Sequence, residues 1–96
     1  MTENMGAVTK AEVEDFAHHA LAVAAPTAVM EWTPASPSIC LGNKILIREA
    51  LVGQYPWQAK EEVLHEMAHL NGLSGHGMAF YEVYIALLKQ FMVGQE

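Results

Sequence analysis

Two histidines and a glutamate have the spacing that a metal site requires. His65, Glu66 and His69 form the pattern His-Glu-x-x-His. On a helix, residues i and i+4 lie on one face about 6 Å apart, so both imidazoles could bind one Zn²⁺ at about 2.0–2.1 Å. The glutamate between them would lie beside the metal, where it could accept a proton from zinc-bound water. The pattern therefore predicts a hydrolytic zinc site with Glu66 as the general base.

A third zinc ligand is expected from the segment that follows. Catalytic zinc commonly has three protein ligands and keeps a fourth position for water. His76 lies seven residues after His69 and between two glycines, beyond Gly72, which is expected to end the helix. The chain could therefore turn back and bring His76 to the metal. In the alternative, His76 is only a polar loop residue and Glu82 is the third ligand.

Three amphipathic helices are expected to position these residues. Thr9 and Glu12 have the spacing of a capping box, and the helix that they begin would end at Pro26. A second helix, 56–70, would begin at Pro56 and carry the first two histidines on its polar face. The apolar residues of a third helix recur every three or four positions: Phe80, Val83, Tyr84, Leu87, Leu88 and Phe91.

The segment between the first two helices is rich in β-branched residues and prolines and has no helical period. Strands are expected at 28–32, 38–41 and 44–47. The last two flank Gly42-Asn43, a two-residue hairpin signal. We therefore predict an α+β fold that contains an N-terminal helix, a small and mainly antiparallel sheet, the zinc helix and a C-terminal helix. This arrangement resembles that of a mini-zincin.

The composition indicates one small domain that is neither disordered nor membrane-spanning. Of the 96 residues, 52% are hydrophobic and 17% are charged, and no apolar run approaches the ~20 residues of a spanning helix. Residues 1–8 are expected to form a flexible tail, and residues 9–96 a single domain. The formal net charge of −6 disfavours nucleic acid and anionic membranes as partners.

Cysteine usage indicates a reducing compartment. Cys40 is the only cysteine, so the chain can form no internal disulfide, and we expect a cytoplasmic protein. Its place in a predicted strand indicates a buried, unreactive thiol. Small domains without disulfides commonly depend on a bound metal or on oligomerisation. The sequence leaves the oligomeric state open.

The histidine-bearing segment resembles the SprT-like (Spartan-type) zinc metalloproteases. Residues 62–69 (EVLHEMAH), followed by 75–80 (GHGMAF), are similar to the zinc helix of that family and to the segment that opens its next helix. The resemblance covers roughly residues 38–91 and is strongest over 62–80. It implies that His65, His69 and His76 are zinc ligands and that Glu66 is the catalytic base.

These observations predict zinc-dependent hydrolysis of peptide bonds in a peptide or protein substrate. A strand beside the zinc helix, such as 44–47, could pair with the extended substrate. The competing hypothesis is a non-enzymatic interaction domain in which the same histidines hold a structural zinc. Structural sites favour a fourth protein ligand, usually cysteine. Cys40 is the sole cysteine, which favours an open, catalytic position.

Four further polar side chains have both a functional and a structural interpretation. Glu62 shares the histidine face and could orient His65, or it could be a surface glutamate. Three tyrosines are candidates to stabilise a developing oxyanion: Tyr55, Tyr81 and Tyr84. Tyr84 also lies on the apolar stripe of the third helix, which favours a place in the core.

Overall fold

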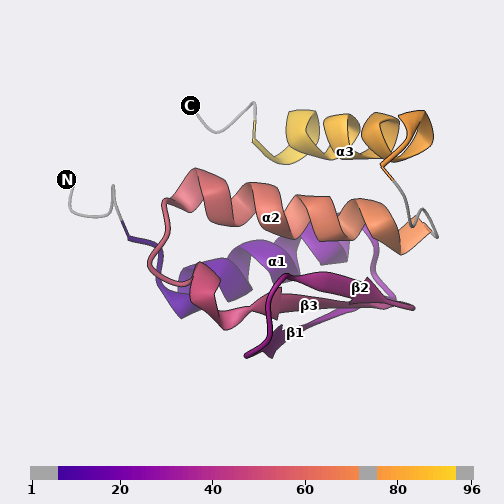
Figure 1. Cartoon of the computed structure of the whole chain (residues 1–96). Helices are drawn as coiled ribbons and strands as arrows, with labels where there is room; N and C mark the ends of the chain where they lie inside the picture. The colour runs from indigo at the N-terminus through magenta and orange to yellow at the C-terminus, as the bar shows by residue number, and fades with distance from the viewer. Residues whose placement is uncertain (1–6, 72–75, 93–96) are drawn as a thin grey trace.

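The computed structural model describes residues 7–71 and 76–92, and three helices and a small sheet within them form an α+β fold (Figure 1). The helices are α1 (Lys10–Ala24), α2 (Pro56–Ala68) and α3 (Met78–Phe91); the strands are β1 (Val29–Thr33), β2 (Ile39–Leu41) and β3 (Lys44–Arg48). The predicted class and order of elements are confirmed. In this part of the chain, no helix has the length and apolar character needed to cross a membrane.

The ends of α1 and α2 follow the predicted signals. The backbone N–H of Glu12 donates to the Thr9 hydroxyl at 3.2 Å, and the Glu12 carboxylate accepts from the Thr9 N–H at 2.9 Å, which completes the capping box. Pro56 is the first residue of α2. The α-helical hydrogen bonding ends at Ala68, and a short 3-10 turn follows at His69–Asn71. The predicted helix stop at Gly72 lies outside the described residues.

The sheet is mixed, which corrects the prediction of a mainly antiparallel sheet. Its strand order is β1-β3-β2. β2 and β3 form the predicted antiparallel hairpin, with Gly42 at φ +61°, a backbone conformation that glycine adopts readily. β1 and β3 pair in parallel, with Val29 opposite Lys44. The chain reverses between β1 and β2 and again between β2 and β3, so β1 and β3 run the same way and become parallel once they are adjacent.

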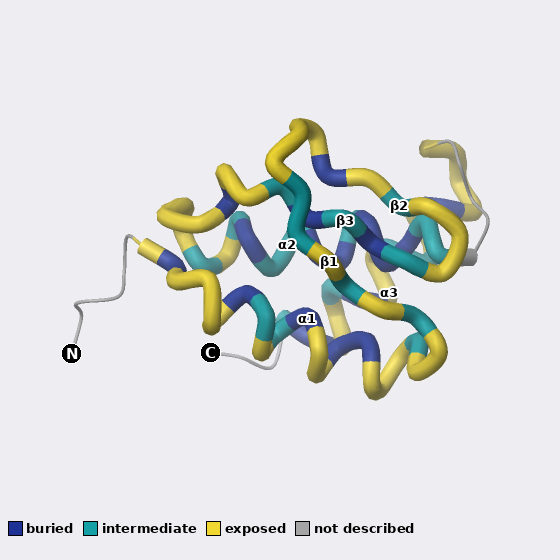
Figure 2. Tube along the Cα trace, turned by 90° about the horizontal axis from the view of Figure 1, so that it is seen from below, coloured by how far each residue is buried: buried dark blue, intermediate teal, exposed yellow. Residues whose placement is uncertain are grey.

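The core lies between the central strand and the helices that cover it. Ile45 and Ile47 of β3 are completely buried, as are Val63 and Leu64 of α2. α2 is in contact with β3 on one side and with α3 on the other, so it lies in the middle of the molecule (Figure 1). Along α1, buried and exposed residues alternate with the helical repeat (Figure 2). The packing therefore holds α2, which carries His65 and leads directly into His69, from several directions.

The N-terminal boundary of the folded part differs from the predicted one. Val8 was assigned to the flexible tail, but only 6% of its surface is exposed. Its N–H donates to the Gln54 carbonyl at 2.9 Å, and its own carbonyl accepts from the Gly53 N–H at 2.9 Å. Two backbone hydrogen bonds and an apolar side chain fix Val8 to the core. Residues 1–6 of the predicted tail lie outside the described part.

Candidate metal centre

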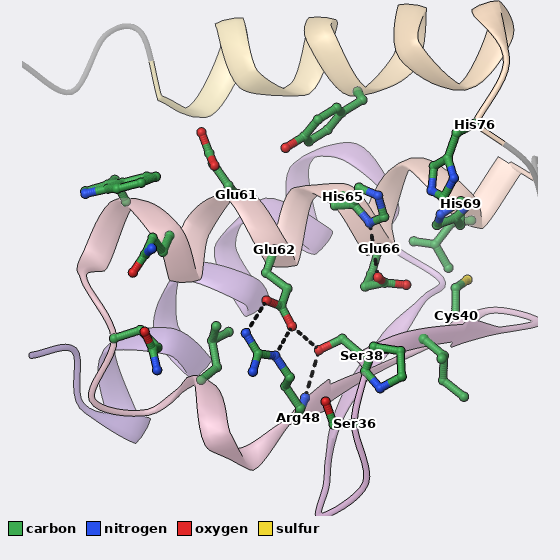
Figure 3. A pocket seen from close by; sticks show the side chains of 18 of the residues that line it. Ser36, Ser38, Cys40, Arg48, Glu61, Glu62, His65, Glu66, His69 and His76 are labelled. Carbon is green, nitrogen blue, oxygen red and sulfur yellow. Dashed lines mark hydrogen bonds and ion pairs between the residues drawn. The ribbon is translucent and has the colours of Figure 1, made fainter.

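α2 presents two rows of side chains to a cleft of about 980 Å³. Residues four positions apart on a helix share a row. One row contains Trp57, Glu61 and His65 and continues to His69, just past the end of α2; the neighbouring row contains Gln58, Glu62 and Glu66. β2 and the connector before it form the opposite wall, and Figure 3 shows these side chains around the opening. The helical repeat of α2 therefore sets the order of groups along the cleft.

The three predicted ligands come together at one end of the cleft. Ligand nitrogens of His65, His69 and His76 all lie within 4.8 Å of one another. A tetrahedral zinc with bonds of 2.0–2.1 Å would need them about 3.3 Å apart, a difference that small side-chain rotations can supply. His76 enters from the segment before α3, opposite the other two (Figure 3). This donor set suits zinc, which binds imidazole nitrogen well.

Phe80 holds the three imidazoles in place, a role that the sequence did not suggest. Its ring is 1% exposed and lies 4.5 Å, centroid to centroid, from the ring of His69, on which it stacks. The corresponding distances to His65 and His76 are 5.1 and 4.8 Å. Its apolar periodicity only indicated a core residue. The additional signal was its position four residues after His76, one turn into the helix that this histidine precedes.

Glu66 is a buried carboxylate beside the histidines. It is 5% exposed, and its Oε2 lies 3.2 Å from Nδ1 of His65. Burial raises the pKa of the Glu66 carboxyl, and the charges of His65 and His69 offset part of that shift. When Nδ1 of His65 carries the proton, it donates to Glu66 and leaves Nε2 free to bind a metal.

The alternative third ligand is not near this group. Glu82 lies on an exposed face of α3 and is absent from the cluster of potential ligands found among the described residues. Among the three tyrosines, only Tyr84 lines the cleft, with its ring 5.5 Å from that of His65. It also packs on Phe80, so the expected core position is only part of its role. Burial raises the pKa of the Tyr84 hydroxyl, and the charge of Glu61 adds to this effect.

Glu62 joins the two walls of the cleft, and neither of its predicted roles describes it. Its carboxylate accepts two hydrogen bonds from Arg48, from Nε at 2.7 Å and from Nη2 at 3.0 Å, and one from the Ser38 hydroxyl at 2.5 Å (Figure 3). The Ser38 oxygen in turn accepts from the Arg48 N–H at 2.9 Å. Burial alone would raise the pKa of Glu62, but the hydrogen bonds from Arg48 and Ser38 outweigh it and the pKa is lowered.

The substitution Glu62→Gln is expected to lower the free energy of unfolding by about 1–3 kcal/mol at pH 7, because it removes a charge-assisted bidentate pair. A lowered pKa stabilises the fold fully above the ordinary value of 4.5, and this contribution is lost as the pH falls through the folded value. The difference in the free energy of unfolding between wild type and variant should therefore decrease as the pH falls below about 4.5. Urea unfolding at several pH values measures it.

The matched control for this measurement is Glu49→Gln. Glu49 is an exposed glutamate close to Arg48 in the chain, and no hydrogen bond or ion pair to its side chain occurs among the described residues. This variant should remain within about 0.5 kcal/mol of wild type. An equal loss in both variants would show that general charge, rather than the Glu62 pair, sets the stability.

Cys40 lies at the cleft and is only half-buried, so the prediction of a buried thiol is wrong in that respect. It is on β2, one of the two edge strands of the sheet, which leaves one side open. Burial raises the pKa of the thiol, and the charge of Glu66 adds to the shift. The thiol therefore stays protonated at neutral pH, and Cys40 is not part of the three-histidine cluster.

These features give an α+β fold with a group of histidines able to hold a metal. The comparison with solved structures finds the crystal structure of the metallopeptidase zymogen of Pyrococcus abyssi abylysin, with a TM-score of 0.62 and 23% sequence identity over 75% of each chain. At that identity the likeness establishes the fold alone. No protein-family model matches the chain, and no curated protein matches it significantly.

Proposed function

We propose that this chain is a zinc-dependent metallopeptidase that hydrolyses peptide bonds, with His65, His69 and His76 as zinc ligands and Glu66 as the general base. The observation that carries the proposal is the convergence of three histidines beside a buried carboxylate in an open cleft. The metallopeptidase-like fold supports it. So does the resemblance of residues 62–80 to SprT-like proteases, which implies the same four residues.

The chemistry divides between the metal and the protein. Zinc, when bound, would activate a water molecule and polarise the scissile carbonyl. Glu66 accepts the proton of the attacking water and donates it to the departing amine. Oε1 of Glu66 is available for this, since Oε2 is the oxygen next to His65. Tyr84, at the rim of the same space, is the hydroxyl best placed to donate to the developing oxyanion.

The edge strand β2 is the element that could bind an extended substrate. The predicted strand, β3, has neighbours on both sides, so its backbone groups are already paired. β2 has one free edge, and Ile39 and Cys40 line the cleft. A peptide could add to that edge by main-chain hydrogen bonds and pass in front of the histidines.

The donor set favours a catalytic zinc over a structural one. The cluster among the described residues contains three protein ligands, whereas structural zinc usually has four. Cys40 lies outside this cluster and does not supply the fourth. A structural zinc would therefore lack its fourth protein ligand here. A catalytic zinc needs only three protein ligands and keeps the fourth position for water.

Metal removal and restoration tests the proposal. The purified protein should contain one zinc per chain and cleave peptides from a mixed library. Dialysis against a chelator should abolish cleavage, and one equivalent of zinc, but not of magnesium, should restore it, since magnesium prefers oxygen ligands. Bound zinc without cleavage of any peptide would favour the interaction domain. Full cleavage by metal-free protein would rule out the zinc mechanism.

A further inference from the structure

The cleft continues along α2 beyond the histidines and contains a carboxylate and an aromatic ring that the proposed chemistry does not use. Glu61 lies one helical turn before His65 in the same row, and Trp57 lies one turn before Glu61. We propose that Glu61 binds the side chain of a lysine or arginine of the substrate, two to three residues C-terminal to the scissile bond, and that Trp57 packs on its stem. This inference rests on the proposed peptidase function.

The charges in the cleft leave Glu61 as the group that faces a substrate. Among the described residues that line the cleft, Arg48 is the only lysine or arginine. Two hydrogen bonds bind it to Glu62. Glu66 is buried beside the histidines. No hydrogen bond or ion pair to the Glu61 carboxylate occurs within residues 7–71 and 76–92, and Figure 3 shows it rising from α2 toward α3. A cationic side chain would complete its interactions.

Trp57 gives the same part of the cleft an exposed apolar surface. It is 53% exposed, and its ring stacks against that of Tyr55 with centroids 6.5 Å apart and planes inclined by 7°. This contact leaves much of Trp57 open to a ligand. Lysine and arginine combine a long apolar stem with a cationic end, and the face of a tryptophan binds both parts. The pair Trp57 and Glu61 therefore matches this class of side chain better than a purely apolar one.

The direction of the substrate follows from the direction of β2. Ser38, just before β2, bonds to Glu62, whereas Cys40, farther along, lies within reach of the charge of Glu66. β2 therefore runs along the cleft in the same direction as α2. A peptide that pairs antiparallel to β2, the more stable geometry, runs the opposite way, from the histidines toward Trp57. Its residues after the scissile bond pass Glu61.

Helix and strand dimensions give the position of the preferred residue. Glu61 lies about 6 Å along the helix axis from His65, and Trp57 lies about 12 Å from it. An extended peptide advances about 3.3 Å per residue. The residue that meets Glu61 is therefore the second or third after the scissile bond. The formal net charge of −6 would also attract basic peptides over longer distances.

The test compares peptides that differ only at the second and third positions after the scissile bond, with lysine, norleucine or glutamate there. For the zinc-loaded wild type, kcat/KM should be about tenfold higher for lysine than for norleucine, the size of one charge-assisted hydrogen bond in a partly buried site. Glu61→Gln should remove this preference, and Glu61→Lys should reverse it toward glutamate. Glu82→Gln, which removes an equal charge from an exposed face of α3, should keep the preference. Trp57→Ala should lower kcat/KM for the lysine peptides severalfold.

A binding measurement separates this inference from the proposed function. Fluorescently labelled peptides are titrated into zinc-loaded Glu66→Gln, with and without the Glu61→Gln substitution, and anisotropy is recorded. Tighter binding of lysine peptides that depends on Glu61 supports the inference even if no peptide is cleaved. Cleavage without a preference at these positions overturns the inference and leaves the peptidase function intact. A preference confined to peptides with a free N-terminal amine, lost on acetylation, would also overturn it, because Glu61 would then bind that amine.

Discussion

The substitution Glu66→Gln is expected to lower kcat/KM for peptide hydrolysis by about 10²–10⁴-fold, the usual contribution of a general base, while leaving zinc bound. Glutamine has nearly the same size and keeps a carbonyl oxygen that can accept from Nδ1 of His65, the contact that Oε2 makes at 3.2 Å. It cannot accept the proton of the attacking water. The expected result is a folded, zinc-loaded protein that binds peptides and does not cleave them.

Two measurements on the same preparation decide the outcome. Metal analysis should give one zinc per chain for both wild type and Glu66→Gln, and initial rates on a peptide with lysine after the scissile bond should differ by the stated factor. Glu82→Gln serves as the control, because Glu82 is an exposed glutamate outside the cleft. Undiminished cleavage by Glu66→Gln would eliminate the general-base mechanism. Loss of zinc together with activity would show that Glu66 acts on the metal site rather than on the proton.

The local features of this fold were predictable from sequence. The capping box of Thr9 and Glu12, the proline that opens α2 and the hairpin at Gly42 each depend on residues within four positions of one another. The relative placement of His65, Glu66 and His69 is equally local, because the helical repeat fixes it. His76 required one further assumption, that the segment after α2 folds back, and the structure brings its ring to the other two.

Features that depend on distant residues were not predictable in the same way. The parallel pairing of β1 with β3 joins residues 15 positions apart in the chain, and nothing in either strand specifies which neighbour it takes. Glu62 illustrates the same limit. Its spacing placed it on the histidine face, but its partners Arg48 and Ser38 lie 14 and 24 residues away. Tertiary contacts, rather than periodicity, decide the role of such a side chain.

The edge position of β2 shows how this non-local information changes the account of function. From sequence, 44–47 was named as an example of a strand beside the zinc helix that could bind a substrate. In the structure this strand, β3, is the central one, and its residues Ile45 and Ile47 are fully buried. The shorter β2 has the open edge and lines the cleft. The proposed direction of the substrate depends on β2, rather than β3, being the strand that binds it. The assignment of Glu61 to the part of the substrate after the scissile bond therefore depends on this too.

The substitution His76→Ala is expected to weaken zinc binding by more than about 100-fold. Loss of a partner that only orients a ligand costs about 10–100-fold, and loss of a direct ligand should cost more. His65 on α2 and His69 in the turn that follows it would remain as a two-residue site. His76 is exposed and precedes α3, so the apo protein should keep its helical content in circular dichroism. Competition with a chromophoric chelator measures the zinc affinity, and cleavage should fall with zinc occupancy.

Thermal unfolding provides an independent readout of the same change. A ligand that binds the folded state at 100 times its dissociation constant stabilises it by about 2.7 kcal/mol, so zinc should raise the Tm of wild type and have little effect on His76→Ala at the same concentration. The matched variant is Glu82→Ala, which removes the alternative third ligand. If Glu82→Ala lost the zinc-induced rise in Tm and His76→Ala kept it, the third ligand would be Glu82, and α3 would have to rotate to bring an exposed glutamate to His65 and His69.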